Sequence, residues 1–141
     1  MDARVERTLV IVKPDGVARG QVGEVLRRVE AKGYSIVALD VRVPDASTLA
    51  EHYVDHVDKP FYAELAAFMA SGPAVLAVVE GHRVVEGVMA LCGPTDPTLA
   101  PPGTIRGDLG RDHGHGPMEN VVHRSDSADA AAREIKVWFR R

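Results

Sequence analysis

The stretch Arg7-Thr8-Leu9-Val10-Ile11-Val12-Lys13 decides the fold that we expect for this chain. Four consecutive apolar residues between charged ends are typical of a buried strand, and the turn residues Pro14-Asp15-Gly16 end it. A second segment, from Pro73 to Glu80, is apolar on both of its faces and therefore predicts a central strand. These two segments indicate a sheet that is buried by helices.

The segments between and after these strands supply the rest of the sandwich. Helical spacing or helix-capping residues predict helices over 21–32, 47–56, 60–70, 84–91 and 128–139, with Ser47 as a cap and Pro60 in a first turn. Further strands are expected over 34–43 and at Val121-Val122, with His123 at the end of the second. This order predicts a split βαβ sandwich with a four-stranded sheet, and a doubly wound sheet is the alternative.

The composition limits the classes of function. The chain has 141 residues, of which 45% are apolar and 26% charged, so we expect a single domain over residues 1–141. A net charge of −3 gives no general attraction to nucleic acid or to anionic membranes, so a phosphate ligand would need local positive charge. Cys92 is the only cysteine, which fits a reducing compartment, and no apolar run is long enough to cross a membrane. We therefore expect a cytoplasmic protein.

The segment from Cys92 to Asn120 has no sustained hydrophobic period. It holds six of the thirteen glycines and five of the nine prolines. Loops of this length inside a compact domain are usually functional or disordered. Since the segment leads directly to His123, we interpret it as a binding loop.

The residues Asn120 to Ser127 place a histidine between polar donors. Taken alone, His123 could be a nucleophile, a general base, a metal ligand or a buried ring satisfied by its neighbours. Walker loops, dinucleotide-binding glycine motifs and paired cysteines are absent from the sequence. What remains is a scattered set of cations, hydroxyl groups and an imidazole, which suits phosphoryl transfer; its members are Lys13, Thr95, Arg106, Asn120, His123 and Ser125.

Several separate motifs, spread over nearly the whole chain, resemble those of the nucleoside diphosphate kinase family. They occur in the family's order and are Glu6 to Val17, His52-Tyr53, His56, Lys59-Pro60-Phe61, Ser71-Gly72-Pro73, Gly93 to Pro97, Pro102 to Asp108, Asn120 to His123, and Ser125 to Ser127. The resemblance implies an α+β, ferredoxin-like βαββαβ sandwich with a four-stranded antiparallel sheet. It also implies a homo-oligomer, either a hexamer or a tetramer.

The activity that this resemblance implies is transfer of the γ-phosphate of ATP or another nucleoside triphosphate to a nucleoside diphosphate. The route is ping-pong through a phosphohistidine at His123, with Glu134 hydrogen-bonded to the far ring nitrogen and Lys13 assisting. By the same resemblance, Mg²⁺ arrives with the nucleotide and the protein holds no metal of its own. The residues implied to bind the phosphates, ribose and base are Lys13, Tyr53, Phe61, Leu65, Thr95, Arg106 and Asn120.

The chain departs from the family pattern in three places. Met89 stands where the family has a phosphate-binding arginine, which predicts reduced efficiency unless Arg124, Arg111 or Arg83 compensates. The loop over 110–117 makes this chain about four residues longer than the pattern; its His113 and His115 could suggest a metal site, but a mobile loop is the simpler reading. Third, Glu119 and Arg124 flank the Asn120 to His123 motif where the family commonly has arginine and glycine.

These departures motivate an alternative to a kinase. The chain could be a nucleotide-binding regulatory homologue with little or no turnover, although the retention of Lys13, Asn120, His123 and Glu134 argues against it. Turnover measured beside nucleotide affinity separates the two hypotheses. Direct binding of nucleic acid has no basic stripe to support it.

Overall fold

The computed structural model describes residues 5–140 and contains one four-stranded sheet. Its strands are β1 (Val5–Val12), β2 (Ser35–Arg42), β3 (Ala74–His82) and β4 (Val122–Arg124). They lie in the order β2-β3-β1-β4, and every neighbouring pair is antiparallel. This order confirms the ferredoxin-like sandwich and excludes a doubly wound sheet, which requires parallel strands.

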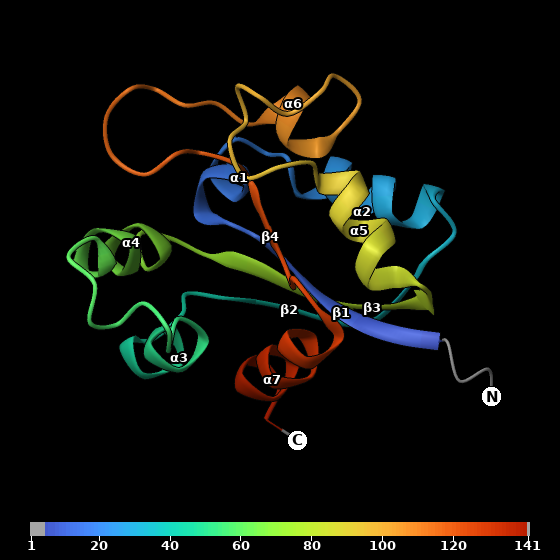
Figure 1. The fold of residues 1–141 in the computed structure, drawn as a ribbon, viewed down its shortest axis with the longest axis horizontal. Helices are drawn as coiled ribbons and strands as arrows, with labels where there is room; N and C mark the ends of the chain where they lie inside the picture. The colour runs from blue at the N-terminus through green and yellow to red at the C-terminus, as the bar shows by residue number, and fades with distance from the viewer. Residues whose placement is uncertain (1–4, 141) are drawn as a thin grey trace.

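Helices cover both faces of the sheet (Figure 1). In that view α2 and α5 lie above the sheet and α3 and α7 below it, while α4 lies beside the end of the sheet. The helices are α1 (Pro14–Ala18), α2 (Val22–Ala31), α3 (Ala46–His52), α4 (Tyr62–Met69), α5 (Val84–Cys92), α6 (Ile105–Leu109) and α7 (Ala128–Trp138).

Strand β1 lies between two apolar clusters. Val10 and Val12 pack in the cluster formed with α2 and α5, whereas Leu9 and Ile11 pack in the cluster formed with α3, α4 and α7. Successive side chains of a strand point to opposite faces, so a strand buried on both faces must be apolar at every position. This alternation explains the uninterrupted apolar run that predicted the strand.

Three details of the helices differ from the predictions. The cap of α3 is Asp45, whose carboxylate accepts a hydrogen bond from Thr48 N, and not Ser47, which lies inside the helix. The helix ends at His52, four residues earlier than expected. Pro60 precedes α4, which begins at Tyr62. An aspartate two residues before Ser47 is an equally good cap, and spacing alone did not distinguish them.

The loop and turn predictions also need correction. Pro14–Ala18 forms the short helix α1 where a turn was expected, and α6 interrupts the long loop. Thr104 caps α6, because its hydroxyl accepts a hydrogen bond from Gly107 N. Five-residue helices carry too few apolar repeats to be visible as a period in the sequence.

The prediction for the histidine strand is wrong in its bounds. Val121 lies outside β4, and His123 is the middle residue of the strand, paired with Ile11 of β1. The backbone of Val121 has φ of 73°, which is incompatible with a strand. His123 is thus held by a sheet ladder and not by the end of a strand.

Within residues 5–140, none of the helices has the length and apolar character needed to cross a membrane.

Candidate active site

Two adjoining cavities open beside β4. One, of about 350 Å³, contains His123, and the other, of about 420 Å³, lies against α4. The residues that line both are Lys13, Phe61, Leu65, Thr95 and Asn120. All nine residues predicted for the site line the histidine cavity, so the fold brings together positions spread from 13 to 134 in the sequence.

Glu134 on α7 holds the ring of His123. Its Oε1 accepts hydrogen bonds from His123 Nε2 at 2.7 Å and from Ser125 Oγ at 2.8 Å. A proton on Nε2 leaves the lone pair of Nδ1 free. The arrangement therefore presents one nucleophilic nitrogen to the cavity.

The protonation states of this pair follow from their surroundings. Burial lowers the pKa of His123, and the hydrogen bond to Glu134 only partly opposes that effect. Burial alone would raise the pKa of Glu134, but the hydrogen bonds from His123 and Ser125 and the nearby His52 lower it overall. At neutral pH the ring is uncharged and the carboxyl is ionised, which is the state required for nucleophilic attack.

A second histidine packs edge-on against the first. The ring centroids of His52 and His123 lie 4.6 Å apart, and Trp138 Nε1 donates a hydrogen bond to His52 Nδ1 at 2.9 Å. Burial, followed by the proximity of His123, lowers the pKa of His52 to about 3. His52 is therefore neutral and carries its proton on Nε2.

These hydrogen bonds bear on metal binding. Donor atoms of His52, His123 and Glu134 lie within 4.8 Å of one another, which would suit a metal ion. However, Trp138 leaves the proton on His52 Nε2, and His123 Nε2 donates its proton to Glu134. A metal would have to displace both protons, so the set fits a hydrogen-bonded pair better than a resident ion.

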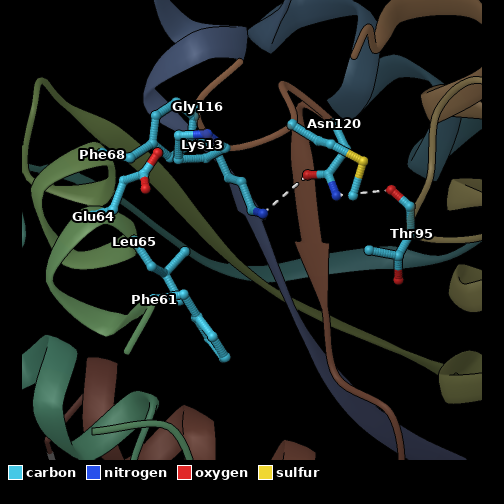
Figure 2. A pocket seen from close by; sticks show the side chains of 10 residues that line it. Lys13, Phe61, Glu64, Leu65, Phe68, Thr95, Gly116 and Asn120 are labelled. Carbon is cyan, nitrogen blue, oxygen red and sulfur yellow. Dashed lines mark hydrogen bonds between the residues drawn. The ribbon is translucent and has the colours of Figure 1, made fainter. Parts of the chain in front are cut away.

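Lys13, Asn120 and Thr95 form a hydrogen-bonded chain in the lining that the two cavities share (Figure 2). Lys13 Nζ donates to Asn120 Oδ1 at 2.9 Å, and Asn120 Nδ2 donates to the carbonyl oxygen of Thr95 at 3.0 Å. Burial and the charge of Arg106 lower the pKa of Lys13 to about 8, although Asp15 opposes them. An anion that binds beside a desolvated ammonium group stabilises its charged form.

Arg106 anchors the loop to the histidine strand. Its guanidinium donates to the carbonyl oxygens of Gly93 at 2.9 Å and Val122 at 2.7 Å, while its buried Nε has no hydrogen-bond partner. Burial lowers the pKa of Arg106, but the group remains charged at neutral pH. The α6 helix thus brings a fixed cation next to β4.

The turn before β4 is strained. Val121 is fully buried with φ of 73°, a conformation that costs a β-branched residue on the order of 1–3 kcal/mol. Val121 N donates to Asp15 Oδ2 at 3.0 Å, and Lys13 N donates to Val121 O at 2.7 Å. A Cβ at Gly16 would lie 2.9 Å from Val121 Cγ1, so only glycine leaves room there. The first turn of α1 therefore holds Asn120 and His123 in place.

The second cavity has an apolar wall supplied by α4. Phe61, Leu65 and Phe68 share one helix face with Glu64, the only carboxylate in the lining, while the loop contributes Gly116, Pro117 and Met118. Sequence reasoning named Phe61 and Leu65 but missed Glu64 and Phe68. Their spacing of three and seven residues from Phe61 would have placed them on the same face. Nothing in the sequence located the loop residues opposite.

The divergent segment of the loop closes on itself. Arg111 and Glu119 form an isolated antiparallel bridge, and His113 Nε2 lies 3.1 Å from Glu119 Oε2. The ring centroids of His113 and His115 are 6.4 Å apart. Among residues 5–140, the only cluster with metal-ligand spacing is the one at His123, and these two histidines are not in it.

Comparison with known proteins agrees with this geometry. A family model described as nucleoside diphosphate kinase matches residues 6–141. The chain is 54% identical over 135 residues to a nucleoside diphosphate kinase of Streptomyces avermitilis, with 95% of this chain and 96% of that protein covered. It is 52% identical over 135 residues to that of Thermobifida fusca, covering 96% and 97%.

Solved structures give the same result. A transition-state mimic of nucleoside-diphosphate kinase from Borrelia burgdorferi, with bound vanadate and ADP, matches with a TM-score of 0.89 and 38% identity over 96% of this chain and 88% of that one. A halophilic nucleoside diphosphate kinase from Halobacterium salinarum in complex with CDP matches with a TM-score of 0.89 and 45% identity over the same shares.

Proposed function

Because this chain belongs to the nucleoside diphosphate kinase family, we propose that it transfers the γ-phosphate of a nucleoside triphosphate to a nucleoside diphosphate through a phosphohistidine at His123. The observation that carries the proposal is the 2.7 Å hydrogen bond between His123 Nε2 and Glu134, which leaves Nδ1 free beside a cationic cavity. ATP is the expected phosphate donor, as the likeness to a complex with ADP suggests.

The reaction then runs in two balanced halves. The lone pair of His123 Nδ1 attacks the γ-phosphorus, the bond to the bridging oxygen breaks, and the nucleoside diphosphate leaves. Glu134 stabilises the positive charge that develops on the ring. In the second half, a terminal phosphate oxygen of another nucleoside diphosphate attacks the phosphohistidine, the P–N bond breaks, and the ring returns to its neutral state.

The residues around His123 neutralise and position the phosphates. Lys13 and Arg106 supply positive charge, and the side chains of Asn120 and Thr95 supply hydrogen-bonding groups at the junction of the two cavities. Phosphoryl transfer needs little covalent chemistry from the protein beyond its nucleophile, so positioning and charge supply most of the catalysis. We assign Tyr53 to the ribose and phosphates, since it also lines this cavity.

The base belongs in the apolar cavity. Phe61 is half exposed there and offers a face on which any base can stack, with Leu65 beside it. Stacking on a π-face is insensitive to the identity of the base. The kinase should therefore accept purine and pyrimidine nucleotides.

The donor set around the phosphate site fits magnesium that is carried by the nucleotide. Besides Glu134, which is used by His123, the carboxylates of the histidine cavity are Asp55 and Asp126, and the remaining charged groups are mainly cations. Mg²⁺ prefers oxygen ligands and usually keeps several waters, so the nucleotide phosphates would supply most of its remaining ligands and the protein few or none. When bound, it neutralises phosphate charge.

The efficiency of the kinase depends on the cations that reach the phosphates. Met89 is uncharged and lines neither cavity. The position where the family has an arginine therefore supplies no cation to the phosphates. One missing charge-assisted contact costs about ten- to a hundredfold in rate or affinity. Unless another cation takes its place, this loss favours reduced efficiency or, at the extreme, a nucleotide-binding regulatory homologue.

We further propose a homo-oligomer of single-domain subunits that acts in the cytoplasm. Strand β2 is an edge of the sheet, and it exposes Val37, Leu39 and Val41 together with the following Val43. An unpaired edge with exposed apolar side chains is a surface that a second copy can cover. A hexamer and a tetramer are both compatible with such an edge.

Labelling with γ-³²P-ATP tests the proposed function. The wild-type protein should form an acid-labile, base-stable phosphoprotein that transfers its label to any nucleoside diphosphate. His123→Ala should abolish the label, whereas His82→Ala, which changes an exposed histidine outside both cavities, should retain it. A wild-type protein that binds ATP without labelling would exclude the kinase and leave the regulatory homologue.

A further inference from the structure

Arg124 shares the cavity of His123 but reaches it from the opposite face of the strand. In β4, His123 pairs with Ile11 and Arg124 pairs with Val10. Val10 belongs to the cluster with α2 and α5, and Ile11 to the cluster with α7. The side chain of Arg124 therefore starts on the α5 side of the sheet, and it still lines the histidine cavity.

The neighbours of Arg124 are a second arginine and the end of α5. Burial lowers the pKa of Arg106, and the positive charge of Arg124 lowers it further. Burial raises the pKa of Cys92 to about 11, and Arg106 and Arg124 both oppose that rise. Arg124 and Arg106 line the same cavity, and β4 packs against α5, the helix that carries Met89.

The charge of Arg124 is poorly balanced within the described chain. Its side chain is only 14% exposed, and its ion pair is with Asp126, whose side chain is 78% exposed. Its Nε is buried without a hydrogen-bond partner, as is the Nε of Arg106. Two desolvated guanidinium groups line one cavity, and among residues 5–140 Arg124 has an ion pair only with a solvated carboxylate. The resulting excess of positive charge is one that an anion at the cavity would neutralise.

We propose that Arg124 is a phosphate-binding residue and that it supplies from β4 the positive charge that α5 lacks at Met89. This inference rests on the proposed kinase function. On nucleotide binding, the guanidinium exchanges its contact with Asp126 for a charge-assisted contact with the phosphate chain, next to Arg106 and on the side opposite Glu134. The substitution at Met89 is then offset, and the kinase retains its full set of phosphate contacts.

The other two arginines considered from the sequence do not fit this role. Arg83 is 64% exposed and pairs with Glu86. Arg111 is exposed and pairs through its backbone with Glu119 in the divergent loop. Neither lines the histidine cavity or the α4 cavity.

Nucleotide affinity measured by calorimetry tests the assignment directly. Arg124→Ala should weaken ADP binding by about ten- to a hundredfold but leave adenosine binding unchanged, because only ADP carries the phosphates. Arg124→Lys should retain part of the affinity, and Arg83→Ala should match the wild type. Circular dichroism and thermal melts establish that each variant is folded. Unchanged ADP affinity in a folded Arg124→Ala variant would overturn the assignment.

A double-mutant cycle tests the replacement of residue 89. Met89→Arg should change kcat/KM less than threefold in the wild type. In the Arg124→Ala background the same substitution should raise kcat/KM at least tenfold. Equal gains in kcat/KM in the two backgrounds would overturn the proposal that Arg124 supplies the charge missing at residue 89. Binding of ADP does not require turnover, so the calorimetric result stands even if the labelling experiment excludes a kinase. The two proposals can therefore fail separately.

Discussion

A histidine can accept a phosphate only if one ring nitrogen keeps its lone pair, and Glu134 determines which nitrogen does so. The carboxylate is fixed in turn by Ser125 Oγ, and it lies only 8% exposed. The eleven-residue spacing between His123 and Glu134 predicts no contact by itself, because the two residues lie on different elements, β4 and α7. Only the packing of α7 against β1, beside β4, gives that spacing its chemical role.

At the residue scale, the lowered pKa of Lys13 predicts how nucleotide binding depends on pH. The charged ammonium is the form of Lys13 that we propose to bind phosphate, and in the free protein it is lost as pH rises through about 8, well below its usual 10.5. Nucleotide affinity should therefore fall above pH 8, and binding there should take up a proton. Calorimetry in buffers of different ionisation enthalpy measures that proton.

The free energy of unfolding depends on pH in the opposite direction from nucleotide affinity, and it should rise as Lys13 loses its proton. Between pH 8 and 10.5 the unfolded chain holds the proton that folded Lys13 has released. The cost of burying this charged lysine is therefore present below pH 8 and is relieved as pH rises.

A matched lysine variant provides the control for the pH dependence of nucleotide affinity. Lys136→Ala, which removes an exposed lysine from α7, should leave the alkaline loss of affinity unchanged. If Lys13→Arg showed the same loss near pH 8, the assignment to Lys13 would be wrong.

At the element scale, α4 serves the site with one face. Phe61, Leu65 and Phe68 recur at helical spacing and form the wall of the second cavity. The same helix buries Met69 in the cluster with β1 and β3, which fixes the wall relative to the sheet. The helix therefore couples the core to the proposed base site.

The α4 wall predicts equal losses for all bases when its stacking ring is removed. Phe61→Ala should raise KM by about five- to a hundredfold for ADP, GDP and CDP alike, since each base loses a similar stacking contact. Steady-state kinetics with the three nucleotides measures the effect. Val54→Ala provides a control, because it removes an exposed apolar side chain that lines neither cavity. A loss confined to one nucleotide would contradict stacking and indicate a base-specific contact.

At the scale of the whole molecule, the sheet has two different edges. Strand β4 forms one edge and carries the site, while β2 forms the other and exposes Leu39 at 55% and Val41 at 61%. A protein that is soluble as a monomer would be expected to protect such an edge with charge or a covering element. The site and the proposed contact between subunits thus lie on opposite edges.

A charge on the β2 edge should dissociate the oligomer. Leu39→Lys places an ammonium group in a contact that excludes water, so the molar mass measured by light scattering should fall below that of the wild type. The wild-type mass also distinguishes a hexamer from a tetramer. Val54→Lys changes a residue of similar exposure, 51%, away from this edge and should leave the mass unchanged. An unaltered mass for Leu39→Lys would place the interface elsewhere.

The sequence by itself determined the central strands, most helices and the family. These follow from local patterns: an apolar run reports burial on both faces, and helical spacing reports one apolar face. Motifs carried through the chain also named the nine site residues, which the structure brings to one cavity. Local pattern did not decide the cap of α3, the short helices α1 and α6, or the bounds of β4.

Only the tertiary structure decided how the charges meet. From the sequence, Arg83, Arg111 and Arg124 were equal candidates to offset Met89, because chain distance does not report which face of a sheet a side chain occupies. The pairing of β4 with β1 places Arg124 on the face opposite His123 yet at the same edge. The strained Val121, held by Asp15 and accommodated by Gly16, likewise depends on contacts over more than 100 residues. Such contacts arise from packing, which no local pattern encodes.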